Sequence, residues 1–216
     1  MKTIFKQLFL GFFVWCFALS GFAQTTINGG NLSGTLTLAG SPYLITEEVT
    51  VPKDSTLTIE PGVVMDFAAG KRMKCYGLLF SEGTATLPIK FTCSADTVYG
   101  WLGLYILGDT SQGTSLFKHS IFEHSSYDYN TEVYKGETMT SGSLIVHHSA
   151  VEIENCEFRE MLQFLEAIYS NVSIAGCTFK NKYYNDTKVD AGLLYGCDLR
   201  IQNCEFSNSD GFTIGL

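Results

Sequence analysis

The chain has 216 residues, of which 45% are hydrophobic and only 17% charged, and its formal net charge is −8. This length usually corresponds to one domain or to two small ones. The acidic balance argues against a nucleic-acid partner, because phosphates attract basic surfaces. With 21 Gly and 4 Pro, the composition also excludes a disordered tail, a proline-rich linker and a charged helical bundle.

Residues 1–23 have the pattern of a secretory signal peptide. Lys2 and Lys6 form a basic start, residues 8–19 are an uncharged apolar run, and residues 20–23 supply the small residues of a cleavage site. The alternative is a membrane anchor, but the run is short for the roughly 20 residues that span a bilayer. We therefore expect a secreted or cell-surface protein with no membrane span in its mature chain. Removing the two lysines leaves 12 basic and 22 acidic residues, a net charge of −10.

The next residues, 24–40, are expected to form an N-terminal lead-in or cap. From residue 41 onward, short segments rich in β-branched and aromatic residues alternate with period two, which predicts strands and little helix. One set of these predicted strands lies at 104–106, 144–146, 167–169, 193–195 and 212–214.

A second set of strands repeats the pattern apolar-x-Ile-x-x-Cys-x-Phe. It occurs at 151–158, 172–179 and 199–206, with a degenerate copy at 117–122, and a polar insert at 125–141 precedes the first full copy. A recurring unit of roughly 20–27 residues with inserted loops predicts a solenoid, in which each turn buries its apolar face against the next. A β-sandwich is the alternative, but it would not explain the recurring pattern.

The segments SPYLITEEVTVPKDSTLTIEPGVVMDF (41–67), GLLFSEGTATLPIKFT (77–92) and GWLGLYI (100–106) resemble the opening turns of bacterial secreted right-handed parallel β-helix proteins with the pectate-lyase-like fold. The resemblance implies an all-β, single-stranded right-handed parallel β-helix of roughly eight turns over residues 41–216. It does not imply an activity, because that superfamily includes polysaccharide lyases, glycosidases, adhesins and inert surface proteins.

Stacked turns place equivalent residues about 4.8 Å apart, so like residues form ladders. We expect one ladder from Ile153, Ile174 and Ile201, and another from the Phe residues at 122, 158, 179 and 206. Without Cys16, six cysteines remain: Cys75, Cys93, Cys156, Cys177, Cys197 and Cys204. Disulfides are one interpretation in an exported protein. We favour a column of buried thiols at 156, 177 and 204, since stacked Cβ atoms lie too far apart for a bridge.

The candidate binding residues are Tyr105, His147, Tyr169 and Tyr195. If Leu104, Leu144, Ile168 and Leu194 face inward, the alternation exposes these four together with Ile145. Tyrosine rings along a sheet provide stacking surfaces and hydroxyls for sugars, although tyrosine also simply suits a half-exposed strand. The insert at 125–141, with Tyr127, Tyr129 and Tyr134, is expected to wall a groove beside this face.

The same face is expected to lack catalytic machinery. It offers no Lys or Arg and few acids, and His147 and His148 have no predictable acid partner. Residues 208–211 (NSDG) and 199–202 (LRIQ) resemble two elements of polygalacturonases, but in reversed order and without the intervening residues. We therefore predict no catalytic residues, no metal and no cofactor.

Residues 211–216 read as the first strand of a further turn that nothing caps, so we expect another domain or a partner to cover it. The expected function is a non-catalytic surface module that contacts a neutral polysaccharide or a cell-surface protein. The alternative is a polysaccharide lyase or glycosidase, or the N-terminal fragment of one.

Overall fold

The computed structural model describes residues 24–95, 100–126, 132–139, 142–161, 163–180, 192–207 and 212–215, so the predicted signal peptide lies outside the described residues. The regular structure is almost all strand. Two 3-10 helices, η1 (Leu38–Gly40) and η2 (Thr110–Gln112), are each a single short turn. Within the described ranges, no helix has the length and apolar character needed to cross a bilayer.

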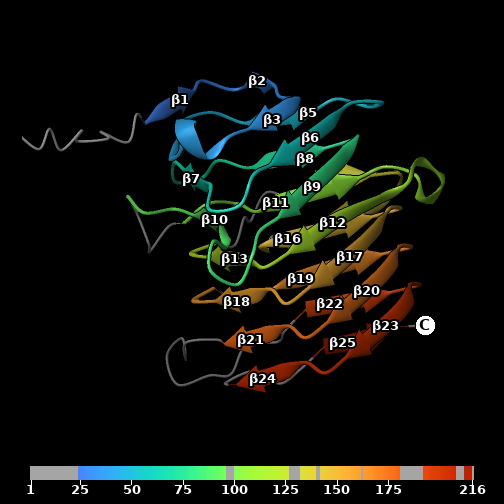
Figure 1. The fold of residues 1–216 in the computed structure, drawn as a ribbon. Coiled ribbons are helices and arrows are strands. Elements are labelled where there is room, and N and C mark those ends of the chain that lie inside the picture. Colours follow the sequence, from blue (N-terminus) through green and yellow to red (C-terminus); the bar gives the residue numbers. More distant parts are fainter. Residues whose placement is uncertain are drawn as a thin grey trace, which may run out of the picture.

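Three long parallel sheets, A, B and C, contain nearly all the strands (Figure 1). Sheet A consists of β1 (Thr25–Ile27), β4 (Tyr43–Ile45), β7 (Val64–Phe67), β10 (Ile89–Thr92), β13 (Ser120–Glu123), β18 (Glu157–Arg159), β21 (Thr178–Lys180) and β24 (Glu205–Ser207). Sheet B consists of β2 (Gly30–Asn31), β5 (Val49–Val51), β8 (Met73–Cys75), β11 (Leu104–Leu107), β16 (Leu144–His147), β19 (Leu165–Ile168), β22 (Gly192–Tyr195) and β25 (Phe212–Gly215). Sheet C consists of β3 (Gly34–Leu36), β6 (Thr56–Ile59), β9 (Leu78–Glu82), β12 (Thr114–Lys118), β17 (Ala150–Glu154), β20 (Asn171–Ala175) and β23 (Asp198–Gln202).

The chain visits A, B and C in turn and then returns to A, so each strand pairs with its equivalent in the next repeat. One antiparallel hairpin, β14 (Glu132–Tyr134) and β15 (Glu137–Met139), interrupts this order between β13 and β16. The first strand of each sheet lies within residues 24–40, where we expected a lead-in or cap. The architecture is therefore an all-β stack of repeats resembling a solenoid.

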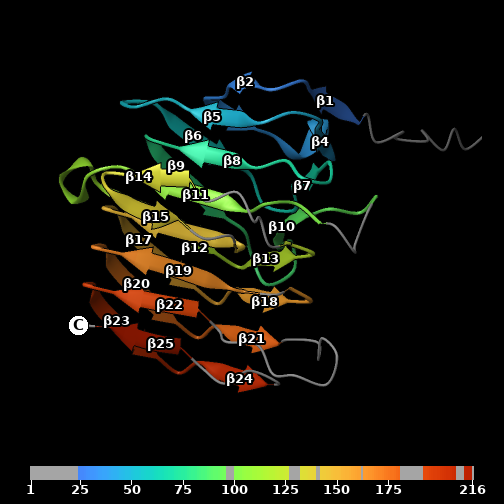
Figure 2. The same ribbon diagram turned by 180° about the vertical axis from the view of Figure 1, so that it is seen from behind.

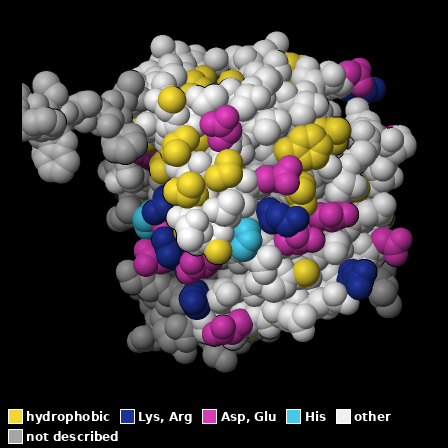
Figure 3. All heavy atoms as spheres, in the orientation of Figure 1, with side chains coloured by type: hydrophobic (Ala, Val, Ile, Leu, Met, Phe, Trp, Pro, Cys, Tyr) yellow, Lys and Arg dark blue, Asp and Glu magenta, His cyan; other side chains and the backbone are white. Residues whose placement is uncertain are grey.

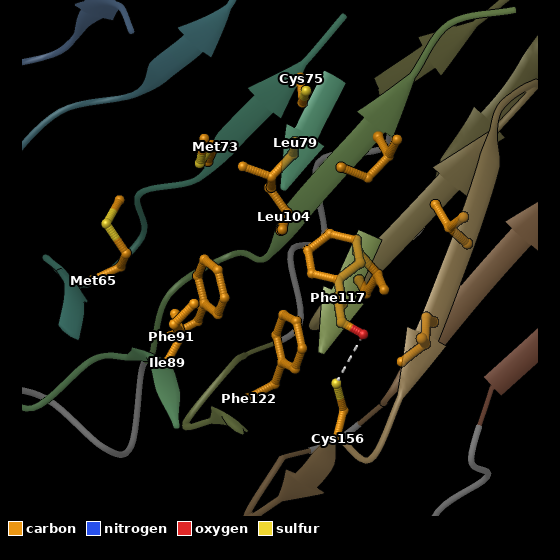
Figure 4. Close-up of a cluster of buried hydrophobic side chains, with 14 of the residues drawn as sticks. Met65, Met73, Cys75, Leu79, Ile89, Phe91, Leu104, Phe117, Phe122 and Cys156 are labelled. Carbon is orange, nitrogen blue, oxygen red and sulfur yellow. Dashed lines mark hydrogen bonds between the residues drawn. The ribbon is translucent and has the colours of Figure 1, made fainter. Parts of the chain in front are cut away.

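The predicted ladders are confirmed. Ile153 pairs with Ile174, which pairs with Ile201. The phenylalanine rings of β13, β18, β21 and β24 stack at centroid distances of 4.8–4.9 Å, and Phe91 of β10 extends the stack by one more ring. Figure 4 shows Phe91 and Phe122 side by side in the core.

The thiols of the repeat also form a column. Cys156 and Cys177 are buried and Cys204 is half-buried, and all three are free. The backbone N–H of Cys156 donates to Sγ of Cys177 at 3.4 Å, and Sγ of Cys156 points at the carbonyl oxygen of Phe117, 3.5 Å away (Figure 4). These contacts support the interpretation of the cysteines as small, buried core residues.

Left-handed residues turn the chain from sheet C into sheet A, one position before each of these cysteines. Asn155 and Asn203 have φ values of 52° and 51°, and Gly176 has a φ of 63°. Asparagine and glycine tolerate this conformation best. A one-residue corner fixes where the next strand begins, and so keeps the ladders in register.

Candidate functional site

The corners between sheets B and C use the same geometry, and two of them carry large aromatic side chains. His148, Tyr169 and Gly196 have φ values of 52°, 49° and 60°. A small residue follows each corner residue: Ser149, Ser170 and Cys197. The backbone N–H of Ser149 donates a hydrogen bond to Oγ of Ser170 at 3.2 Å, which joins two successive corners. The corners therefore stack on one another and present their side chains along one edge of the molecule.

Aromatic rings form a continuous row along this edge. The ring centroid of Tyr134, on the hairpin, lies 6.1 Å from that of His148. The centroids of His148 and Tyr169 are 5.5 Å apart, and so are those of Tyr169 and Tyr195. Tyr169 is 41% exposed and Tyr195 is 38% exposed. Two of the four predicted binding residues are thus neighbours on the surface. Tyr134 was expected beside this face as part of a groove wall, whereas His148 was not expected as a companion of the tyrosines.

Glycines in the following turns make room for the two exposed rings. A Cβ atom at Gly196 would lie 2.6 Å from Cδ1 of Tyr169, and one at Gly215 would lie 2.6 Å from Cδ2 of Tyr195. Each ring therefore leans over the backbone of the next turn, which restricts its rotation. We call Tyr134, His148, Tyr169 and Tyr195 the aromatic row.

The surroundings of Tyr134, His148 and Tyr169 shift their pKa values in the direction that favours the uncharged form at neutral pH. An interaction with the hydroxyl of Tyr195 raises the pKa of Tyr169. Burial raises the pKa of Tyr134, with a further contribution from Tyr76. Burial, together with the charge of Lys135, lowers the pKa of His148 below the ordinary value near 6.5. The row offers flat rings and uncharged hydrogen-bonding groups.

Next to the row, a hollow of about 350 Å³ opens between the hairpin and the loop after β11. The hydroxyl of Tyr134 and the ammonium of Lys135 both donate to the carbonyl oxygen of Gly108, at 3.2 and 2.5 Å. The remaining lining side chains include Lys53, Tyr76, Asp109 and Gln112. These residues provide polar groups at one end of the aromatic row.

The other two predicted binding residues are buried, which corrects the expectation that they are exposed. Tyr105 is 2% exposed, and Ile145 and His147 are 0% exposed. They do face away from the main core, but Met139 of the hairpin packs with Tyr105, Ile145 and Leu107 in a second hydrophobic cluster. Figure 2 shows the hairpin lying across sheet B. The described part of the insert covers this face, where we expected a groove wall.

His147 has an acid partner that the sequence analysis did not find. Its Nε2 lies 2.7 Å from Oε1 of Glu166, and both side chains are fully buried. The expectation that Ile168 faces inward is wrong. The register pairs Ile168 with His147 in the outward column, and Leu165 and Ala167 face the core instead. An alignment of Ser149 with Ser170 in the sequence predicts this register, because each serine lies two positions after the last residue of its strand, His147 in β16 and Ile168 in β19.

The covered face also holds basic groups, contrary to our expectation. Lys74 lies beside Tyr105 in the sheet, and the guanidinium of Arg72 donates to the hydroxyl of Tyr105 at 3.2 Å. Glu132 of the hairpin binds Arg72 at 3.0 Å and Lys74 at 2.9 Å, and Glu48 lies 3.2 Å from Lys74. Burial lowers the pKa of Lys74, but the two carboxylates outweigh it and leave that pKa raised. These charges hold the hairpin in place.

Among the described residues, no three His, Cys, Asp or Glu side chains are grouped so as to hold a metal ion. The near-motif at 208–211 lies outside the described residues. Arg200 of the second near-motif lies on β23, where it pairs with Ser173 of sheet C.

Comparison with known proteins gives one partial similarity. The chain is similar to Protein bark beetle of Drosophila melanogaster, with 35% identity over 80 residues that make up 36% of this chain and 3% of that protein. The chain thus spans a very small part of the length of this relative. No protein-family model and no solved structure matches the chain.

Proposed function

We propose that the chain is an exported right-handed parallel β-helix module, of the pectate-lyase-like kind, that binds a neutral glycan along the aromatic row. The three parallel sheets, visited in strict rotation, support the β-helix. The pattern of residues 1–23 supports export.

The observation that carries the binding proposal is the pair of exposed rings, Tyr169 and Tyr195, on consecutive turns. The centroids of the two rings lie 5.5 Å apart and their planes meet at 71°, so the rings offer two differently oriented apolar faces to a chain of sugar rings. Aromatic faces stack on the apolar faces of such rings while hydroxyls donate and accept hydrogen bonds. The net charge of −10 after signal-peptide removal disfavours an acidic polysaccharide.

The test is affinity electrophoresis through gels containing β-glucan, mannan, xylan or polygalacturonate. We expect a neutral polysaccharide to retard the wild-type protein. Tyr169→Ala or Tyr195→Ala should weaken retention by about threefold to tenfold each, the usual value of an aromatic contact. Phenylalanine at the same positions keeps the ring and should retain most binding. Val133→Ala, at an exposed side chain of the hairpin, is the matched control.

Unchanged retention of the Tyr169→Ala, Tyr195→Ala double variant would refute the aromatic row as the binding surface. Retention by polygalacturonate alone would refute the choice of a neutral ligand. Each variant is compared by thermal unfolding, so that a folding defect is recognised separately.

A second candidate, a polysaccharide lyase or glycosidase, is favoured by one observation. Four titratable side chains lie on the outward face of sheet B: Lys74, Tyr105, His147 and Glu166. Arg72, directly before β8, donates to the hydroxyl of Tyr105 on the same face. The hairpin covers this face, and the acids there are engaged with bases. Product release from the same polysaccharides, abolished by Glu166→Gln while the protein stays folded, would establish this enzymatic function in place of simple binding.

A further inference from the structure

A larger hollow, of about 620 Å³, lies on the outward face of sheet A. This face belongs to a different sheet from the aromatic row and carries none of its residues. Figure 3 shows hydrophobic side chains gathered over η1, β7 and β10, with basic, acidic and histidine side chains beside them. The hollow therefore combines an apolar part and a polar part.

The apolar part is formed by Leu38, Pro42 and Val64. Leu38 is 37% exposed and contributes apolar surface to the hollow. Gly62 has a φ of 82°, and a Cβ there would lie 3.2 Å from Leu38 and 3.5 Å from Leu87. Glycine at this position suits the positive φ and leaves room for the side chain of Leu38.

The polar part follows one column of the sheet. Asp66 pairs with Thr92, and Glu123 lies one position after Phe122, which pairs with Phe91. The hydroxyl of Thr92 lies 3.2 Å from Nδ1 of His124. These side chains are held in defined positions by contacts within the sheet.

Two of the polar groups keep hydrogen-bonding capacity that the described residues do not use. Asp66 accepts from the N–H and the hydroxyl of Ser94, at 2.9 and 2.5 Å, and a carboxylate has about four acceptor sites. Lys90 binds Glu123 at 3.1 Å, and an ammonium has three donors. Asp66 lies on β7 and Lys90 on the neighbouring strand β10, and both side chains face outward. Lys90 is paired with Val64, two positions before Asp66, so the two charged residues are diagonal neighbours. They offer acceptors and donors to one ligand.

Most charged groups around the hollow are engaged with one another. Lys90 and Arg159 bind Glu123 at 3.1 and 2.7 Å. Arg159 also lies 3.4 Å from Glu157, and His124 lies 3.1 Å from Glu160. Burial raises the pKa of Glu123, but its hydrogen bonds from Arg159 and Lys90 outweigh this, and its pKa lies below the usual value. The carboxylate therefore stays ionised, and because both cations already bind carboxylates, the site favours an uncharged ligand over an ion.

We propose that this hollow binds a single neutral sugar ring, whose apolar face contacts Leu38, Pro42 and Val64 while neighbouring hydroxyls donate to Asp66 and accept from Lys90. The hollow is large enough to admit such a ring together with bound water. The site is independent of the aromatic row, so either binding surface can fail without the other.

The experiment is saturation-transfer NMR with methyl glucoside, methyl galactoside and methyl mannoside, each added to the full chain. We expect at least one glycoside to bind the wild-type protein. Asp66→Asn keeps the shape but loses acceptors, and it should weaken binding by about tenfold. Val64→Trp fills the apolar part and should abolish binding while leaving Asp66 intact.

Asp198→Asn, the same chemical change at an exposed position of β23, is the matched control and should bind normally. The Tyr169→Ala, Tyr195→Ala double variant should also bind normally. The proposal is overturned if no glycoside binds, or if ethylamine binds and the glycosides do not. Binding that survives both Asp66→Asn and Val64→Trp would overturn it as well.

Discussion

His147 with Glu166 and His124 with Glu160 have the same chemistry in two environments. The first pair is fully buried, with 2.7 Å between Nε2 and the carboxylate oxygen. The second has side chains 19% and 49% exposed and a distance of 3.1 Å. Water solvates the second pair when it breaks, whereas removal of Glu166 leaves His147 without its acid beneath the hairpin. The structural importance of a carboxylate here depends on its surroundings.

We therefore expect Glu166→Ala to lower the free energy of unfolding by about 3–5 kcal/mol, the usual loss when one member of a buried pair is removed. Glu160→Ala should cost less than about 1 kcal/mol, because exposed pairs contribute little. Urea unfolding of both variants measures the difference. Equal losses would contradict a special role for burial.

At the scale of elements, the hairpin β14–β15 determines which face of the molecule is accessible. Glu132 connects it to Arg72 and Lys74, which lie about 60 residues earlier in the chain. Met139 closes the apolar cluster over Tyr105 and Ile145. The hairpin thus covers one candidate surface and supplies Tyr134 to the other.

Replacing Glu132 with alanine should loosen the hairpin, because two largely buried cations lose a partner. We expect trypsin to cleave after Lys135 about tenfold faster, which corresponds to about 1.4 kcal/mol less resistance to local opening. Glu137→Ala, in the same hairpin and without an ion pair among the described residues, is the control. A cleavage rate equal to the control would show that the ion pairs do not hold the hairpin.

The sequence was sufficient for the ladders but not for the hairpin, for a physical reason. The repeated Ile, Cys and Phe fix the register locally, and every copy supports the others. The packing of the insert depends on ion pairs between Glu132 and two distant residues, Arg72 and Lys74. No local sequence pattern predicts such pairs. Consequently Tyr169 and Tyr195 were correctly placed at the surface, whereas Tyr105 and His147 were wrongly expected there.

At the scale of the whole molecule, stability comes from contacts between neighbouring turns. Phe158 stacks on a ring to either side, at 4.8 and 4.9 Å. Phe206 stacks on Phe179 at 4.8 Å and is 37% exposed. Phe158, in the interior of the stack, is fully buried, whereas Phe206, in the last described turn, is partly exposed.

We expect Phe158→Ala to destabilise the protein by about 3–5 kcal/mol, as for a fully buried phenylalanine. Phe206→Ala should cost roughly half as much, since part of its area already contacts water. Thermal and urea unfolding distinguish the two. A Phe206 variant as damaging as the Phe158 variant would contradict stabilisation by nearest-neighbour stacking.

The hairpin leaves the stack after β13 and rejoins it at β16, yet β16 still pairs directly with β11 of the preceding turn. The number of residues between two paired strands therefore does not affect how those strands align. A gene segment that runs from one corner to the equivalent corner could be duplicated or lost as a unit, and every remaining strand would keep its partner. We expect relatives of this chain to differ by whole turns and by corner insertions, with the intervening strands constant in length.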